Sequence, residues 1–229
     1  NDKNTDFAKV LMKKVIVAGA GPAGMMAAIT AAENGAEVTL LEKMKRPGRK
    51  MMITGKGRCN VTNAADVPEI IRQFKGNGAF LHSAFAAFDN QDVMRFFEDQ
   101  GVPLKVERGN RVFPVSDHAL DCVDAMVHRL HELGVTIETE AAVRDVLLEH
   151  GHAAGVRTVT DAIYRADAVI LALGGASYPG TGSSGDGYEM ARKLGHTVTP
   201  ILPSLVPLET EEAWPKDVQG LSLRNVRVK

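Results

Sequence analysis

The sequence has few cysteines, no long apolar run and almost no net charge. Its two cysteines, Cys59 and Cys122, lie far apart in the 229 residues, so no Cys-x-x-Cys redox pair or cysteine-based zinc site is indicated. No apolar stretch reaches the roughly 18 residues that span a bilayer, and residues 1–9 are polar and charged and lack the apolar core of a signal peptide. We therefore expect a cytoplasmic protein with no membrane partner, whose first 12 residues are disordered or tag-like.

The charge balance gives no general reason to expect a nucleic-acid partner. Lys and Arg number 27 against 28 Asp and Glu, which leaves a formal net charge of -1. A hydrophobic share of 45% is ordinary for a globular protein, and a chain of this length buries enough surface to fold without a disulfide or a metal. No histidine and carboxylate pattern completes a metal site, and His128 and His131 are interpreted as ordinary helix residues.

A strand, a helix and a second strand are predicted near the start of the chain. Residues 13–18 and 37–41 are short apolar runs, and residues 22–32 carry small and apolar residues at helical spacing. Gly35 is expected to end the helix. Such a βαβ unit, within about 30 residues, is the building block of parallel sheets.

The turn between the first strand and the helix is rich in glycine. In a Gly-x-Gly-x-x-Gly string at this position, the first glycine permits the tight turn and the second lets a diphosphate approach the backbone. The third lets the helix pack closely on the strand, and the helix N-terminus offers free N–H groups to the phosphates. The residues that we expect at a dinucleotide are Gly19, Gly21, Pro22, Ala23 and Gly24.

Glu42 closes the second strand, followed by Lys43. A carboxylate there can accept hydrogen bonds from ribose hydroxyls and would repel a 2′-phosphate, which disfavours NADP. Glu42 is therefore assigned to the cofactor, and Lys43, the first cation of the basic loop described below, is assigned with it. A plain glycine-rich turn and a solvated strand end are the alternatives, but the strand, the small helix face and Glu42 together favour dinucleotide binding.

Three further patterns favour FAD over NAD. The second strand leads into a long loop instead of another βα unit, and an antiparallel meander is predicted over residues 143–148, 154–159 and 162–165. A buried strand over residues 168–173 then runs into Gly174 and Gly175, where bare backbone can approach a cofactor. The third pattern is a basic loop without acids, which contains Lys43, Lys45, Arg46, Arg49, Lys50, Lys56 and Arg58.

This basic loop has two other readings, a solvated face or an RNA-binding patch. It contains no aromatic residue on which bases could stack, so we expect no nucleic-acid partner. Lys56 and Arg58 are candidates to stabilise an anionic reduced flavin. Cys59 is interpreted as a small residue packed against the cofactor, because no partner cysteine or histidine lies near it in the sequence.

The remaining elements are predicted from periodicity and turn residues. They are a loop over residues 43–63, a helix over 91–99, a hairpin over 104–115 that turns at Gly109-Asn110, a helix over 117–133 capped by Ser116, a strand over 135–138, and a helix that ends near residue 194. After residue 200, prolines interrupt the chain and short extended stretches surround Leu205 and Leu223. We interpret this change as the start of another domain, cut short by the end of the sequence.

Three longer strings resemble a known family. Residues 48–63 read Gly-Arg-Lys-Met-Met-Ile-Thr-Gly-Lys-Gly-Arg-Cys-Asn-Val-Thr-Asn, residues 174–188 read Gly-Gly-Ala-Ser-Tyr-Pro-Gly-Thr-Gly-Ser-Ser-Gly-Asp-Gly-Tyr, and residues 203–208 read Pro-Ser-Leu-Val-Pro-Leu. Together they are similar to bacterial FAD-dependent oxidoreductases grouped around L-aminoacetone oxidase, a group that includes flavoenzymes reducing dehydro-bile acids.

The resemblance implies an α/β fold: a glutathione-reductase-like, Rossmann-type FAD domain with a parallel sheet and an antiparallel meander over residues 13–201. Residues 202–229 would form the first part of a mostly β inserted domain. The resemblance also implies cofactor contacts at Arg49 and Lys50, at Arg58, Cys59 and Asn60 along the flavin, at Val143 on the adenine, and at Ala172 and Gly174 near the diphosphate and ribityl chain.

We therefore expect an FAD-dependent oxidoreductase that passes hydride between the flavin and a small organic substrate, with NAD(P)H as a candidate electron donor. The alternatives are a non-catalytic nucleotide-binding protein and an RNA-modifying flavoprotein. A flavoprotein of the succinate and fumarate class is also considered, although its covalent-flavin histidine motif is absent. No side chain is assigned to catalysis.

Overall fold

The computed structural model describes residues 12–203, 209–221 and 226–227. Two compact units divide the chain, residues 1–196 and residues 197–229. The predicted N-terminal tail (residues 1–12, of which only Met12 is described) and the extended stretches around Leu205 and Leu223 lie outside the described residues. In the second unit the described chain contains one short 3-10 helix, η4 (Trp214–Lys216), and the predicted boundary at residues 201 and 202 stays a prediction.

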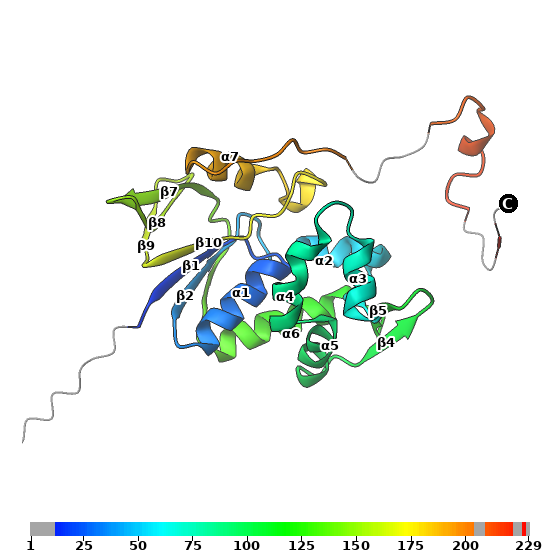
Figure 1. Ribbon diagram of the computed structural model, residues 1–229, viewed down its shortest axis with the longest axis horizontal. Helices are drawn as coiled ribbons and strands as arrows, with labels where there is room; N and C mark the ends of the chain where they lie inside the picture. Colours follow the sequence, from blue (N-terminus) through cyan, green and yellow to red (C-terminus); the bar gives the residue numbers. More distant parts are fainter. Residues whose placement is uncertain (1–11, 204–208, 222–225, 228–229) are drawn as a thin grey trace, which may run out of the picture. The chain divides into compact units, whose positions relative to one another are not determined.

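A four-stranded parallel sheet forms the centre of the first unit (Figure 1). Its strand order is β10-β1-β2-β6, with β1 (Lys14–Ala18), β2 (Glu37–Leu41), β6 (Thr136–Glu138) and β10 (Ala168–Leu171). All pairs are parallel, so the carboxyl ends of β1, β2 and β10 meet at one edge. This edge is where ligands bind in open α/β sheets.

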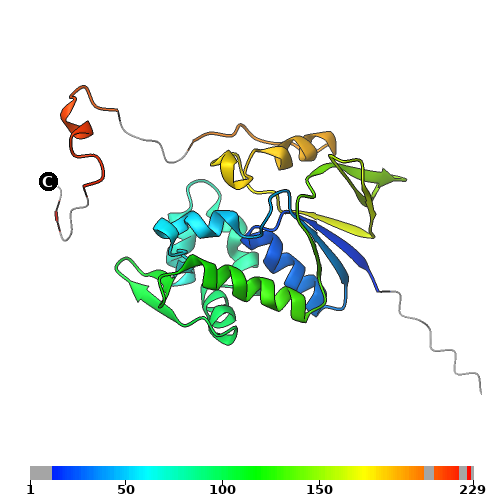
Figure 2. The same ribbon diagram turned by 180° about the vertical axis from the view of Figure 1, so that it is seen from behind.

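Helices cover one face of the sheet. Side chains alternate along β1, so that Val17 packs against α1 (Pro22–Glu33) and α6 (Ala119–Glu132), and Ile16 and Ala18 face the other side. Helices α1 and α6 lie side by side in both views (Figure 2). Apolar side chains such as Met25, Leu40 and Leu130 fill this core.

An antiparallel meander and the last helix cover the other face. The meander consists of β7 (Val143–Glu149), β8 (His152–Thr158) and β9 (Ile163–Arg165), and the helix is α7 (Asp186–Lys193). Val143, Val156 and Met190 pack with Ile16 and Leu41 in a second buried cluster. The predicted Rossmann-type architecture, with parallel sheet and meander, is confirmed.

A smaller helical and β region follows the basic loop. It comprises α3 (Val67–Gln73), η2 (Gly78–Leu81), α4 (His82–Ala87), α5 (Asn90–Asp99) and a sheet of β3 (Thr62–Asn63), β5 (Arg111–Pro114) and β4 (Leu104–Glu107). The pairing of β4 with β5 confirms the predicted hairpin.

Two local predictions are wrong. The segment 43–63 is not a loop throughout, because α2 (Arg49–Ile53) and η1 (Thr54–Gly57) form within it and Met51 is buried in the core that includes α6. Ser116 does not cap the long helix, whose N-cap is His118. The Ser116 hydroxyl instead accepts from the His118 N–H at 3.2 Å and donates to Asp121 at 2.5 Å.

Candidate functional site

The glycine-rich turn leads from β1 into α1 at the carboxyl edge of the sheet. Gly21 is the N-cap residue, with extended φ and ψ of -74° and 179°, and no side chain caps the helix. Pro22 occupies the first turn, which contains no acidic residue. No acidic side chain in the first turn of α1 therefore neutralises the positive end of the helix dipole. This end of the helix is available to bind an anion.

Each glycine in this turn has a different physical role. Gly19 has a φ of +101°, and a Cβ there would lie 2.5 Å from the carbonyl oxygen of Ala172. A Cβ on Gly24 would lie 1.8 Å from the carbonyl oxygen of Gly19, so only glycine lets α1 approach β1. A Cβ on Gly21 would meet nothing within 4 Å. The fold thus requires Gly19 and Gly24, whereas the missing side chain of Gly21 only keeps the adjoining space open.

Glu42 lies beside this turn, directly after β2. Its side chain is buried, with 8% of the residue exposed, and its Oε2 accepts from the Ala20 N–H at 2.8 Å. Its Oε1 accepts from the Met44 N–H, also at 2.8 Å. These two bonds orient the carboxylate, and each oxygen retains a lone pair that a ribose hydroxyl could use.

A cavity of about 500 Å³ joins the turn, Glu42 and the end of β10. Its walls come from the carboxyl ends of β1, β2 and β10, the start of β7, and α7. Among the residues predicted at the cofactor, those that line it are Gly19, Gly21, Pro22, Ala23, Glu42, Lys43, Arg49, Lys50, Val143, Ala172 and Gly174. The tertiary structure therefore brings together residues from five separate parts of the sequence.

A second glycine-rich segment, residues 174–187, forms another wall of this cavity. The Lys50 ammonium donates to the Ser177 carbonyl at 3.0 Å and to the Ser183 hydroxyl at 3.1 Å. The Lys43 ammonium lies 2.7 Å from a carboxylate oxygen of Asp186. This pairing holds the pKa of Asp186 below its usual range, mainly through the Lys43 hydrogen bond. Two cations of the basic loop thus fix the second glycine segment.

Four predicted residues do not line the cavity, namely Gly24, Arg58, Cys59 and Asn60. Gly24 contributes through helix packing, as described above. Asn60 is exposed, on the segment between η1 and β3.

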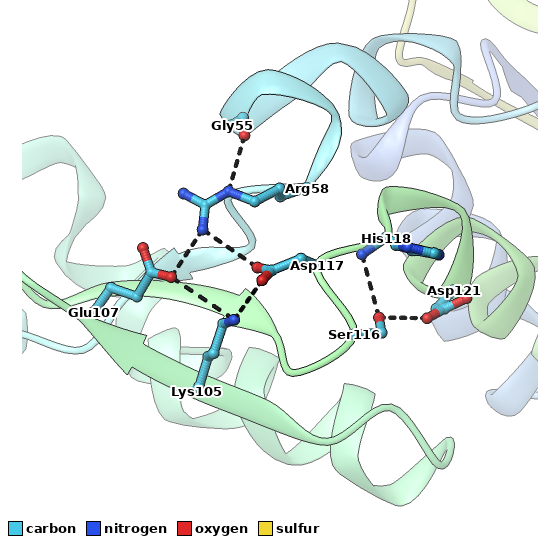
Figure 3. A network of polar contacts seen from close by, with 8 residues as sticks. All are labelled: Gly55, Arg58, Lys105, Glu107, Ser116, Asp117, His118 and Asp121. Carbon is cyan, nitrogen blue, oxygen red and sulfur yellow. Dashed lines mark hydrogen bonds and ion pairs between the residues drawn. The ribbon is translucent and has the colours of Figure 1, made fainter. Parts of the chain in front are cut away.

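Arg58 belongs to a network of ion pairs outside the cavity (Figure 3). Its guanidinium donates to Glu107 at 2.8 Å and to Asp117 at 3.3 Å, and it stacks 4.0 Å above the Phe113 ring. Lys105 completes the network, 2.7 Å from Asp117. The hydrogen bond from Lys105 lowers the pKa of Asp117, and the hydrogen bond to Glu107 raises the pKa of Arg58. A role for Arg58 in stabilising reduced flavin stays a prediction, and these carboxylates already balance its charge.

The two cysteines meet in the core, which their separation in sequence did not indicate. Both thiols are free and buried, Cys59 on the segment after η1 and Cys122 on α6. The neighbouring Cys122 thiol lowers the pKa of Cys59, and the contact with Cys59 together with burial raises the pKa of Cys122. Cys59 also has a φ of +62°, which few residues other than glycine adopt.

Sequence reasoning missed several residues that line the cavity. They are Ala20, Leu41, Ala141, Leu171, Leu173, Thr181, Gly182, Ser183, Asp186, Gly187, Tyr188 and Ala191. The glycines of residues 174–187 signalled a special loop, but no pattern linked Asp186 to Lys43, 143 residues apart. Among the described residues, no group of three or more His, Cys, Asp or Glu is placed to hold a metal ion. Nor does any helix in that part of the chain combine the length and apolar character needed to cross a membrane.

The cavity suits a dinucleotide on its own chemistry. Bare backbone at Gly21 lies next to a helix N-terminus, which fits a diphosphate, and a buried carboxylate follows the neighbouring strand, which fits a ribose. The fold and this site define a Rossmann-type dinucleotide-binding protein.

Comparison with known proteins then gives the family. The model of the HI0933-like protein Rossmann domain matches residues 13–227, so the chain belongs to this family. It is 33% identical over 204 residues to the 3-dehydro-bile acid delta(4,6)-reductase of Clostridium scindens, covering 88% of this chain and 48% of that protein. It is 31% identical over 208 residues to a ribosomal RNA dihydrouridine synthase of Escherichia coli, covering 90% of this chain and 50% of that protein. The chain spans about half the length of these relatives.

Solved structures share the fold. A Mycobacterium smegmatis Sdh1 structure superposes with a TM-score of 0.59 at 22% identity, over 80% of this chain and 38% of that one. The 3-ketosteroid-delta4-(5alpha)-dehydrogenase of Rhodococcus jostii gives a TM-score of 0.52 at 17% identity, over 85% of this chain and 56% of that one. The predicted membership of an oxidoreductase family related to dehydro-bile-acid reductases is confirmed by the family match and the Clostridium relative.

Proposed function

We propose that this protein is an FAD-dependent reductase whose substrates are small organic molecules with a carbon–carbon double bond conjugated to a carbonyl. The observation that carries the FAD assignment is one cavity in which the glycine turn, Glu42 and the Ala172–Gly174 backbone face one another. FAD is preferred to another flavin because this cavity reaches from the Glu42 carboxylate, which we assign to a ribose, to a helix N-terminus suited to a diphosphate.

The residues of the chain would divide the work of holding FAD. Glu42 would accept from the adenosine ribose, the turn at 19–23 would hold the diphosphate, and Val143 would border the adenine. Arg49 lines the cavity and would lie near the phosphates. When bound, the flavin supplies hydride chemistry at N5, and the protein supplies its orientation and electrostatic surroundings.

The substrate class follows from what two relatives have in common. One is named for reducing a 3-dehydro-bile acid at delta(4,6) positions, and the other for making dihydrouridine in ribosomal RNA. Both names describe reduction of a carbon–carbon double bond conjugated to a carbonyl, in a steroid ring system and in a uracil ring. An electron-poor double bond of this kind accepts hydride at the carbon remote from the carbonyl.

A small molecule is preferred to RNA on the charges of this chain. The net charge is -1, and three cations of the basic loop, Lys43, Lys50 and Arg58, are engaged in contacts within the protein. The RNA reading remains the second candidate because of the named Escherichia coli relative.

The free thiols are consistent with the cytoplasmic location that we also propose.

Extraction of the bound ligand from purified protein, followed by mass measurement, tests the cofactor. We expect FAD; recovery of no flavin, or of FMN alone, would refute the cofactor assignment. Anaerobic bleaching of the flavin absorbance by NADH and by NADPH then tests the electron donor.

The substrate class is tested by reoxidation of the reduced protein. A 4-en-3-one steroid should restore flavin absorbance and yield the saturated ketone, whereas the matching saturated ketone should not. Ribosomal RNA incubated with reduced protein and analysed for dihydrouridine by mass spectrometry is the competing arm. Dihydrouridine formation without steroid turnover would replace the small-molecule reading with the RNA reading.

A further inference from the structure

Asp186 and Lys43 face each other across the wall of the cavity. Lys43 directly follows Glu42, the carboxylate proposed for the ribose, and Asp186 is the first residue of α7. Their charged atoms lie 2.7 Å apart, and both residues line the cavity. The ion pair is therefore part of the wall beside the proposed ribose position.

A cation at this position has a specific consequence in Rossmann-type sites. An acid after the second strand binds the 2′-hydroxyl of an adenosine ribose, and a basic residue nearby accommodates a 2′-phosphate instead. Glu42 and Lys43 place both kinds of group side by side. Glu42 thus favours a free 2′-hydroxyl, whereas Lys43 would favour a 2′-phosphate. Which of the two riboses the site prefers depends on whether the Lys43 ammonium is free to bind a phosphate.

The structure shows that Lys43 is engaged. Besides the Asp186 carboxylate, its ammonium contacts the Ser184 hydroxyl, and Ser184 donates to the other Asp186 oxygen at 2.9 Å. Asp186 also sits at the N-terminus of α7, where a carboxylate is favoured by the helix dipole. Glu42, Lys43 and Asp186 together carry one net negative charge, which opposes a phosphate dianion.

We propose that Asp186 is a specificity-determining residue: by pairing with Lys43 it withholds this cation from a 2′-phosphate, so that the cavity selects adenosine with a free 2′-hydroxyl. This inference rests on the proposed function, because it takes the cavity to be an adenine-dinucleotide site. The discrimination comes from a repulsive element as well as an attractive one. It should therefore weaken as salt screens the charges.

Competition against FAD tests the inference. Purified protein in limiting FAD is titrated with 5′-ADP or with 2′,5′-ADP, and the rise in fluorescence of released FAD gives the two affinities. The wild type should prefer 5′-ADP by at least about tenfold. Asp186→Asn should reduce this preference by about tenfold, because it frees Lys43 while leaving Glu42 in place.

Matched variants separate a specificity role from a structural one. Asp186→Glu should retain the preference, and Asp145→Asn, which removes a carboxylate outside the cavity lining, should leave it unchanged. The double variant Asp186→Asn with Lys43→Gln should lose the gain in 2′,5′-ADP affinity. Asp186→Ser provides a second route if the asparagine variant folds poorly. General damage to the fold would weaken both nucleotides equally and would not change their ratio.

The outcomes distinguish this inference from the proposed function. A wild type that binds both nucleotides equally, or an Asp186→Asn variant with an unchanged ratio, overturns the inference and leaves the FAD site intact. If the purified protein binds no FAD at all, there is nothing for either nucleotide to displace, and the proposed function fails instead.

Discussion

Gly21 and Gly24 lie three residues apart in the same turn, yet substitution by alanine should affect them in opposite ways. A Cβ on Gly24 would lie 1.8 Å from the Gly19 carbonyl oxygen, against an ordinary contact of at least 3.4 Å. The obstacle is backbone, and Gly19 is itself fixed by a 2.7 Å hydrogen bond from its N–H to the Leu41 carbonyl. Helix α1 would have to move away from β1, so Gly24→Ala should destabilise the fold by about 3 kcal/mol.

Gly21→Ala should leave the fold nearly unchanged and remove the cofactor. The residue has a φ of -74°, which alanine adopts freely, and its Cβ would meet nothing within 4 Å. The loss of a glycine at the helix N-cap and the lower entropy of the unfolded alanine chain should largely cancel, to within about 1 kcal/mol. The new methyl group would instead project into the space proposed for the diphosphate and weaken FAD binding by at least about tenfold.

Urea unfolding followed by circular dichroism gives the stability of both variants, and flavin content after gel filtration gives cofactor retention. Gly101→Ala is a control for glycine loss in a turn with positive φ, 79°, outside the cavity. It should lose some stability and keep FAD. A Gly21→Ala protein with wild-type FAD content would refute the placement of the diphosphate, and a Gly24→Ala protein of wild-type stability would refute the close packing of α1 on β1.

Three further predictions concern other parts of the first unit. Glu42→Gln should cost about 1–3 kcal/mol of stability and weaken FAD binding, because an amide nitrogen would face the N–H of Ala20 or Met44. Urea unfolding and FAD titration check this prediction, and unchanged values in both would contradict it. The Asp117 pKa is lowered in the folded protein, so its stabilising effect should be present above the ordinary pKa of 3.8 and disappear as the pH falls through the lower folded value. Asp117→Asn should therefore unfold at less urea than wild type at pH 7 and at the same urea concentration well below pH 3.8; an equal difference at both pH values would exclude the ion-pair explanation. The buried thiols should react only slowly with a small alkylating reagent in the native protein, and Cys59, whose pKa is lowered, should react before Cys122. Peptide mass spectrometry gives the order of labelling, and labelling of Cys122 before Cys59 would contradict the prediction.

The sequence predicted the central fold closely because its signals are local. The βαβ unit is marked by short apolar runs, glycines and helical periodicity within 30 residues, and the structure has β2 at the predicted residues 37–41. The hairpin at Gly109-Asn110 was also predicted from its turn residues, and the meander from three short strand-like segments. The helix α2 was not, because its five residues are too few to show a period and it is stabilised by burial of Met51 beside α6.

By itself, then, the sequence determined the central strands and long helices, their order and the glycine turn proposed for a diphosphate, since each depends on the conformational preferences of neighbouring residues. Only the tertiary structure decided which distant side chains meet. The pairing of Lys43 with Asp186, the contact of Cys59 with Cys122 and the neutralisation of Arg58 by Glu107 and Asp117 join segments 49 to 143 residues apart. Charges and thiols in a sequence carry no mark of their eventual partners, because those partners are set by the packing of helices and sheets.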